Sequence, residues 1–202
     1  LTCTIFLQLR LFNMTNAFNP MVTNPLTNHP QAIERAADIK LLVLDVDGVL
    51  TDGSLLVGSD GKEFLKTFDS LDGHGIKLLQ STGVTVAIIT GRSSGMVEGR
   101  ARELGIKEVQ MGVSNKYEAL QALIKKTGHQ LSETAAMGDD WPDLAILPKV
   151  HLAACPHQAH DEVKKRAHYI TQRIGGHGAV RELCDLILKA QNNYERLLQE
   201  SL

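Results

Sequence analysis

A chain of 202 residues is long enough for one α/β domain with its own core and too short for two domains of ordinary size. Apolar residues make up 43% of the sequence, the usual share for a globular protein with a packed interior. The formal net charge of -2 argues against a protein that binds nucleic acid or an anionic membrane surface.

The cysteines and the first residues limit the setting of the protein. Cys3, Cys155 and Cys184 are far apart and form no Cys-x-x-Cys pair, which favours a reducing, cytoplasmic compartment over a disulfide framework. No apolar run is long enough to span a bilayer. Residues 1–36 include a tract rich in Asn, Thr and Pro that cannot bury much surface, so they predict a flexible leader before a domain over residues 37–202.

From Ile39 onward, short β-branched runs alternate with amphipathic helical stretches. This alternation predicts a parallel sheet covered by helices, the Rossmann-like doubly wound α/β class. The strands are near-continuously apolar, as expected for strands buried on both faces. We expect strands at 40–45, 85–90, 108–111, 134–137, 151–153 and 168–170, and helices at 75–81, 93–104, 116–127, 157–167 and 179–198.

The segment 51–68 interrupts this alternation. Two short apolar runs, 55–57 and 64–66, flank Gly58-Ser59-Asp60-Gly61, which is a strong turn signal. The pattern predicts a β-hairpin that projects just after the first strand. Its exposed edge would pair readily with another chain.

The first expected strand ends in Leu44-Asp45-Val46-Asp47-Gly48-Val49. Ligands of open α/β sheets bind outside the carboxyl ends of the strands, so both aspartates belong to a candidate site. Two carboxylates this close in a partly dry site repel each other, and a cation is needed to keep both ionised. For this element alone, a turn in which the aspartates act as caps is the simpler alternative.

Three later segments also place polar groups at the ends of expected strands or the starts of helices. Thr90-Gly91-Arg92 offers an anion a hydroxyl, backbone N–H groups and a guanidinium. Lys116 begins an expected helix, and Gly138-Asp139-Asp140 with Asp143 supplies oxygen ligands suited to Mg²⁺. Each segment alone could be capping or solvated surface, but the four together are hard to explain by structure alone.

The order Asp45-x-Asp47, Thr90-Gly-Arg, Lys116 and Gly138-Asp139-Asp140-x-x-Asp143 resembles the four motifs of haloacid dehalogenase superfamily phosphatases, over the chain from Ile39 onward. The resemblance implies that Asp45 attacks phosphorus to form an aspartyl-phosphate, with Asp47 as general acid and then base. It implies that Thr90 and Lys116 hold the phosphoryl oxygens. Mg²⁺ would lie between Asp45, the backbone carbonyl of Asp47 and Asp139, with Asp143 nearby.

Many members of that superfamily carry an inserted cap domain. Here the segment 53–68 has room only for the hairpin, and 91–116 only for one helix and one strand, so a capless enzyme is expected. An open site suits a macromolecular substrate or closure by a neighbouring subunit. The hairpin edge and the glycine-rich stretch 173–182, a candidate anion cradle before the final helix, favour the neighbouring subunit.

The stretches 44–53, 68–76, 89–92 and 175–182 are similar to the capless, tetrameric phosphatases of 3-deoxy-D-manno-octulosonate 8-phosphate, a lipopolysaccharide precursor. This resemblance implies Mg²⁺-dependent hydrolysis of that ester by a cytoplasmic homotetramer, without nucleic-acid or membrane partners. It implies a substrate-binding set whose basic members suit a phosphate and a carboxylate: Asp47, Asp69, Ser70, Leu71, Asp72, Gly73, Lys77, Arg92, Arg100 and Lys116.

Three positions depart from that family's pattern. Leu71, Lys77 and His177 stand where members often carry a basic residue or arginine, and a lysine cannot reproduce the bidentate fork of an arginine. The substrate therefore stays open between this ester and another sugar-acid phosphate, such as a sialic-type 9-phosphate.

Two interpretations from other classes fit these residues less well. A signalling receiver domain would need an adjacent acidic pair after its first strand, whereas this chain has Asp45-x-Asp47 followed by a hairpin. A catalytically inactive module retained for oligomerisation would not need the catalytic set, yet every catalytic carboxylate, Thr90 and Lys116 are present.

Overall fold

The computed structural model of the protein describes residues 30–202, and its centre is a six-stranded parallel sheet. The strand order is β5-β4-β1-β6-β7-β8, so the chain winds outward from β1 in both directions, as predicted for a doubly wound fold. Each strand lies within two residues of its expected bounds: β1 (Leu41–Leu44), β4 (Thr85–Ile89), β5 (Glu108–Gln110), β6 (Thr134–Met137), β7 (Leu152–Cys155) and β8 (Tyr169–Ile170).

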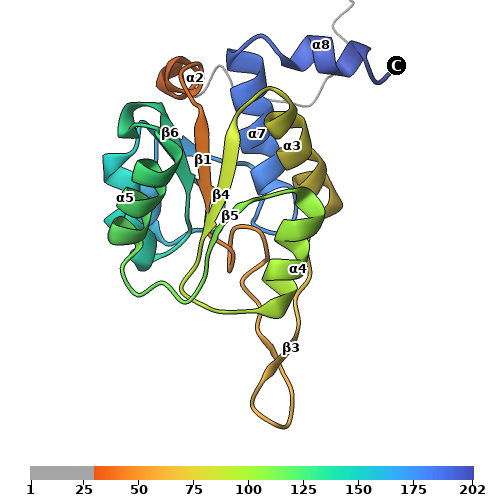
Figure 1. The fold of residues 1–202 in the computed structure, drawn as a ribbon, viewed down its shortest axis with the longest axis vertical. Helices are drawn as coiled ribbons and strands as arrows, with labels where there is room; N and C mark the ends of the chain where they lie inside the picture. Colours follow the sequence, from red (N-terminus) through yellow and green to blue (C-terminus); the bar gives the residue numbers. More distant parts are fainter. Residues whose placement is uncertain (1–29) are drawn as a thin grey trace, which may run out of the picture.

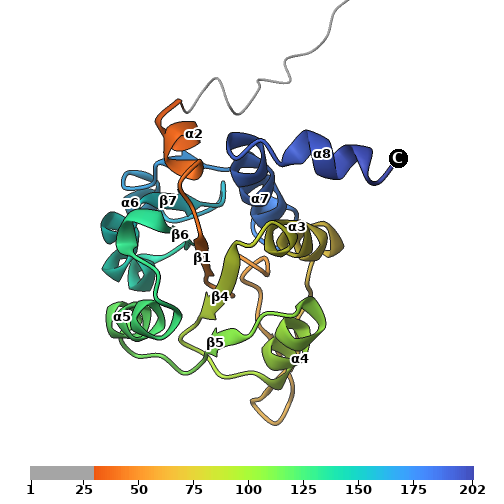
Figure 2. The same ribbon diagram turned by 45° about the horizontal axis from the view of Figure 1, so that its top comes forward.

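Helices cover both faces of the sheet, and the alternation of side chains along each strand decides which helices each face meets (Figure 1). Leu42 and Leu44 of β1 pack with α2 (Pro30–Ala36), α3 (Ser70–Ser81), α4 (Gly95–Leu104) and α7 (Ala179–Ala190). Leu41 and Val43 pack on the opposite face with α5 (Lys116–Thr127) and α6 (Asp161–Lys164). Figure 2 shows the same division from above, with β1 between the two helical layers.

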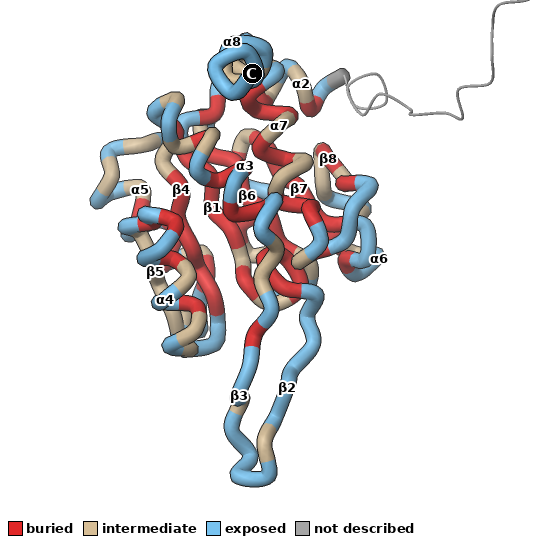
Figure 3. Tube along the Cα trace, turned by 90° about the vertical axis from the view of Figure 1, so that its right-hand side faces the viewer, coloured by how far each residue is buried: buried red, intermediate tan, exposed pale blue. Residues whose placement is uncertain are grey.

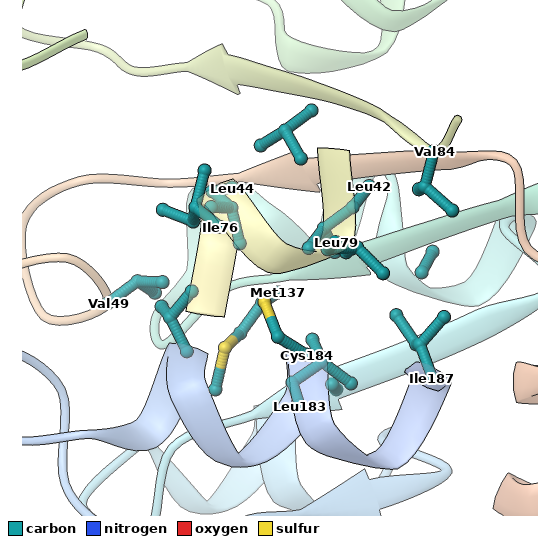
Figure 4. Packing of buried hydrophobic residues seen from close by; sticks show 14 of the residues in the cluster. Leu42, Leu44, Val49, Ile76, Leu79, Val84, Met137, Leu183, Cys184 and Ile187 are labelled. Carbon is teal, nitrogen blue, oxygen red and sulfur yellow. The ribbon is translucent and has the colours of Figure 1, made fainter. Parts of the chain in front are cut away.

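Helices α3 and α7 pack closely together over β1. Figure 4 shows Leu183, Cys184 and Ile187 of α7 directed toward Ile76 and Leu79 of α3 and toward the sheet. Gly75 permits this approach, since a Cβ atom there would lie 2.8 Å from the Arg181 side chain and 3.3 Å from Cys184 Cβ. Cys155 and Cys184 are buried and unpaired, and Cys3 lies outside the described residues.

Three predicted helices have different bounds in the structure. Helix α3 begins five residues earlier than expected, at Ser70, because the Asp69 carboxylate accepts hydrogen bonds from the Leu71 and Asp72 N–H groups. The expected helix 157–167 is reduced to α6, where the His160 ring caps the Glu162 N–H group. The expected helix 179–198 is two helices, because Asn192 adopts a left-handed φ of 58° between α7 and α8 (Tyr194–Gln199).

Residues 1–36 were predicted to form a flexible leader, and positions 1–29 of this segment lie outside the described residues. Its last seven residues form helix α2, in which Ala32 and Ala36 are fully buried, so the folded domain starts before residue 37. The described part of the chain also contains three short 3-10 helices: Leu131–Glu133, Trp141–Ala145 and Leu147–Lys149. Within residues 30–202, no helix is both long and apolar enough to cross a membrane.

The predicted hairpin is present as β2 (Leu56–Val57) paired with β3 (Glu63–Leu65). It projects from the carboxyl-terminal edge of the sheet and is mostly exposed (Figure 3). Its apolar side chains face solvent, with Phe64 66% and Val57 53% exposed.

Candidate active site

The aspartates that follow β1 lie in a tight loop. The N–H groups of Val49, Leu50 and Thr51 all donate to the carbonyl oxygen of Val46, which turns the chain directly after the strand. Gly48 has a φ of 89°, and a Cβ atom there would lie 2.1 Å from Asp139 Oδ2. Only glycine at position 48 therefore allows the loop after β1 and the loop after β6 to approach this closely.

Lys116 joins the carboxylates of the two loops. Its Nζ atom lies 2.8 Å from Asp45 Oδ1 and 2.6 Å from Asp143 Oδ1, and its side chain is only 5% exposed. Lys116 begins α5, whose cap is Asn115, and the start of α5 thus delivers the ammonium to the predicted nucleophile. Asp143 is held in turn, because its Oδ2 atom accepts hydrogen bonds from the N–H groups of Asp139 and Asp140.

Asp45, Asp139 and Asp143 each offer a carboxylate oxygen within 4.8 Å of the others. Burial, followed by the neighbouring Asp143 carboxylate, raises the pKa of Asp139 to about 7 and that of Asp45 to about 6. One lysine does not offset three clustered carboxylates, so the group has the charge and the hard oxygen ligands for a divalent cation such as Mg²⁺. Asp143 belongs to this cluster, although the metal ligands expected from the sequence did not include it. Metal binding by the Asp47 backbone carbonyl stays a prediction.

A pocket of about 620 Å³ opens above this cluster. It holds the predicted catalytic residues Asp45, Asp47, Thr90 and Lys116, together with Arg92 of the predicted substrate set. Trp141 stands at the pocket with 62% of its surface exposed. The four motifs separated in sequence therefore meet at one edge of the sheet, as predicted.

The rest of the predicted substrate set lies elsewhere in the chain. Ser70, Gly73, Lys77 and Arg100 line a separate cavity of about 190 Å³ between α3 and α4. Arg100 donates to the Asp69 carbonyl oxygen at 3.0 Å, and Leu71 is 46% exposed beside α7. Within residues 30–202 of one chain, these residues do not join the pocket of Asp45.

Asp72 serves the packing of α3 against α7. It is 1% exposed, and its carboxylate accepts hydrogen bonds from the N–H groups of Arg181 at 2.7 Å and Gly178 at 3.3 Å. Burial raises the pKa of Asp72 to about 6, against the lowering effect of these backbone donors. The carboxylate is enclosed and already bonded within its own chain, and a substrate contact by Asp72 stays a prediction.

The glycine-rich stretch packs on the catalytic loop of its own chain. Gly176 N donates to the Val49 carbonyl oxygen at 3.0 Å. The Gln158 side chain bridges the two segments: its Nε2 donates to the Gly48 carbonyl oxygen at 2.8 Å, and its Oε1 accepts from Gly175 N at 3.0 Å. The stretch thus supports the loop of Asp45 and Asp47, a role that the expectation of an anion cradle did not include.

Two charged residues beside Asp47 were missed by the sequence analysis. Lys66 donates a hydrogen bond to Asp47 Oδ1 and lies 2.8 Å from Glu63 Oε1. Both come from β3 or the residue after it. The sequence offered one signal for this contact: a glutamate and a lysine flank the apolar pair Phe64-Leu65 in the hairpin.

The site combines an aspartate loop after the first strand of a parallel sheet, a lysine at the start of a later helix and a second aspartate loop. This combination defines the class of haloacid dehalogenase-like hydrolases. The family model of that description matches residues 109–183. The chain is 44% identical to the 3-deoxy-D-manno-octulosonate 8-phosphate phosphatase KdsC of Yersinia pestis, over 81% of this chain and 87% of that protein. It is 42% identical to KdsC of Escherichia coli K12, over 84% and 90%.

Solved structures agree with this likeness. The phosphatase of Moraxella catarrhalis, determined with magnesium ion, phosphate ion and the sugar acid KDO, is 42% identical and superposes with a TM-score of 0.82 over 85% of this chain and 98% of that chain. The cobalt-bound Haemophilus influenzae phosphatase is 37% identical, with a TM-score of 0.77 over 79% and 93%. The chain belongs to the 3-deoxy-D-manno-octulosonate 8-phosphate phosphatase family, a capless branch of the haloacid dehalogenase superfamily.

Proposed function

We propose that this protein hydrolyses 3-deoxy-D-manno-octulosonate 8-phosphate to the free sugar acid and inorganic phosphate, a step in making lipopolysaccharide precursors. The observation that carries the proposal is the meeting of Asp45, Lys116 and Asp139 at the bottom of one pocket, in a chain of this family. The proposed setting is the cytoplasm, in keeping with the unpaired, buried Cys155 and Cys184.

The proposed cofactor is Mg²⁺, held by the carboxylates of Asp45 and Asp139, with Asp143 adjacent and the Asp47 backbone carbonyl as a further ligand. When bound, the cation supplies charge neutralisation for the transferring phosphoryl group. The three clustered carboxylates fit this group, because a divalent cation among them would relieve the repulsion that the single Lys116 ammonium leaves.

In the first chemical step, an oxygen of Asp45 forms a bond to phosphorus while the bond from phosphorus to the sugar oxygen breaks. Asp47, which lines the same pocket, gives its proton to the leaving alkoxide. In the second step, water attacks the aspartyl-phosphate, Asp47 takes the water proton, and the phosphorus–Asp45 bond breaks to release phosphate. Thr90 and Lys116, which line the same pocket, would hold the phosphoryl oxygens through both steps.

We also propose that the working enzyme is a homotetramer in which the hairpin packs against neighbouring subunits. The hairpin exposes five apolar side chains: Leu55, Leu56, Val57, Phe64 and Leu65. Several large exposed apolar side chains on one projecting hairpin are typical of an interface. Lys77 and Arg100 lie outside the pocket of their own chain, which supports a substrate site completed by a second subunit.

The experiment that tests the function is phosphate release with Mg²⁺ from a panel of phosphorylated metabolites, run beside an Asp45→Asn variant. We expect 3-deoxy-D-manno-octulosonate 8-phosphate to stand well above hexose and sialic-type phosphates, and the variant to be inactive. If another ester is hydrolysed fastest and Asp45→Asn is still inactive, the proposed mechanism holds. The different substrate preference would then be attributed to Leu71, Lys77 and His177. No hydrolysis of any ester would favour an inactive oligomerisation module instead.

A further inference from the structure

Lys66 is buried, unlike the residues that precede it on the hairpin. The neighbouring residues Phe64 and Leu65 are 66% and 45% exposed, whereas the side chain of Lys66 is only 1% exposed. In Figure 3, the hairpin is mostly exposed tube, with a buried segment where β3 rejoins the body of the protein. Burial of an ammonium is costly unless it is paired, so its partners indicate why it is there.

Those partners are the carboxylates of Asp47 and Glu63. Lys66 Nζ donates to Asp47 Oδ1 and lies 2.8 Å from Glu63 Oε1. On the other side, Arg92 Nε lies 3.6 Å from Asp47 Oδ2 and Arg92 Nη2 lies 3.8 Å from Glu63 Oε1. Two cations, Lys66 and Arg92, thus alternate with two carboxylates, Asp47 and Glu63. Lys66 bonds one oxygen of Asp47, and the half-exposed Arg92 lies near the other.

A β-bulge makes this arrangement possible. Val57 pairs with Glu63 and Leu56 pairs with Leu65, so Phe64 is an extra residue on its strand. In a regular strand, residues three positions apart point to opposite faces. The bulge at Phe64 reverses that alternation, so that Glu63 and Lys66 meet on the same side.

We propose that Lys66 is a positioning residue for catalysis: it holds Asp47 by Oδ1, so that Oδ2 faces the pocket and exchanges the proton with the leaving oxygen. The pocket is lined by Asp47 and Arg92 but not by Lys66, so Lys66 acts through Asp47 rather than on the substrate. The inference deepens the proposed function, and it needs only that the substrate be an alkyl phosphate ester.

The proposed role affects one part of the reaction. An alkyl phosphate releases a strongly basic alkoxide, which requires the proton from Asp47 as the phosphorus–oxygen bond breaks. 4-Nitrophenyl phosphate releases a weakly basic phenolate that leaves without a proton. The ratio kcat/KM reports the steps through formation of the aspartyl-phosphate, so misplacement of Asp47 lowers it for the alkyl ester alone.

The test compares Lys66→Met with the wild-type full-length protein on both esters in Mg²⁺. We expect kcat/KM for the alkyl ester to fall by roughly 10- to 100-fold, and kcat/KM for 4-nitrophenyl phosphate to change by less than about threefold. Glu63→Gln keeps the shape of the side chain and weakens its hold on Lys66. It should lower kcat/KM for the alkyl ester more than for 4-nitrophenyl phosphate, but by a smaller factor than Lys66→Met does. Lys62→Met on the exposed part of the hairpin is the matched control and should change neither.

Equal losses on the two esters would show a general structural role and overturn the proposal, as would a rise in KM alone, which would mean direct substrate binding. If Lys66→Met fails to fold, as judged by circular dichroism, Glu63→Gln carries the same comparison. The alkyl ester is whichever one the wild type hydrolyses best. The test therefore still works if 3-deoxy-D-manno-octulosonate 8-phosphate is not the substrate, and the substrate panel shows that failure separately.

Discussion

A Cβ atom on Gly175 would lie 1.9 Å from the carbonyl oxygen of Gly48, so the glycine-rich stretch rests directly on the backbone of the catalytic loop. The contact joins the segment before α7 to the residue that follows Asp47. Because both partners are backbone, neither can move aside without shifting the loop that carries Asp45 and Asp47. The position of the nucleophile therefore depends on a segment 130 residues further along the chain (45 to 175).

We predict that Gly175→Ala lowers activity by roughly 100-fold, since a displacement of about 1 Å at a catalytic group can cost that much. We expect the free energy of unfolding to fall by about 1–3 kcal/mol through overpacking. Phosphate release and urea denaturation measure the two effects. The control is Gly99→Ala in α4, where a Cβ atom meets nothing within 4 Å and should stabilise the helix by about 0.5–1 kcal/mol. Unchanged activity in Gly175→Ala would show that the loop is not supported there.

Magnesium affinity should increase with pH. Burial and neighbouring carboxylates raise the pKa of Asp139 to about 7 and that of Asp45 to about 6, so below these values the ligands hold protons that the cation must displace. The dissociation constant should fall as the pH rises from 5.5 to 7.5, by up to about tenfold per pH unit for each proton released. Calorimetry in two buffers of different ionisation enthalpy counts those protons. Asp139→Asn should weaken binding at every pH, and a dissociation constant that is independent of pH would contradict the prediction.

The buried carboxyl of Asp72 should make stability depend on pH. Burial raises its pKa from 3.8 to about 6, so the folded state binds this proton more tightly than the unfolded state does. The stabilisation is complete below about pH 4 and is lost as the pH rises through about 6. A rise of roughly two pKa units corresponds to about 3 kcal/mol.

Asp72→Asn isolates this contribution, because an amide does not titrate. The difference in unfolding free energy between the wild type and Asp72→Asn, without Mg²⁺, should fall by up to about 3 kcal/mol from pH 4 to pH 7. Urea denaturation at each pH provides the measurement. The control is Asp161→Asn, which removes a carboxylate whose side chain is 87% exposed. A constant wild-type minus Asp72→Asn difference across the range would exclude the proposed titration.

If the hairpin packs in a homotetramer, a charge introduced among its apolar side chains should weaken the assembly. Phe64 is 66% exposed in one chain, and Phe64→Glu would place a carboxylate in the proposed interface, where desolvation opposes it. Light scattering after size-exclusion chromatography should show a tetramer for the wild type and smaller species for Phe64→Glu. Ser59→Glu at the exposed hairpin tip should leave the tetramer intact. A monomeric wild type would overturn the assembly prediction.

Much of the fold was predictable because its signals are local. The strand Leu41–Leu44 is an unbroken apolar run, as expected for a strand buried on both faces, and α5 has the expected bounds of Lys116–Thr127 because Asn115 and Gly128 cap its two ends. The boundary errors arose where a single residue, through its side chain or its backbone conformation, sets the end of a helix. Asp69 extends α3 toward its N-terminus, His160 shortens α6, and Asn192 ends α7.

The sequence by itself determined the chemistry of the site, since Asp45, Thr90, Lys116 and Asp139 follow strands whose parallel order places their ends together. Only the tertiary structure decided which other groups reach that site. It brought Lys66 to Asp47 across a β-bulge, laid Gly175 on Gly48, and enclosed Asp72 between α3 and α7. These contacts join residues distant in the chain through packing and a single inserted residue. A local pattern can mark such residues as unusual, but it does not say which distant group each will meet.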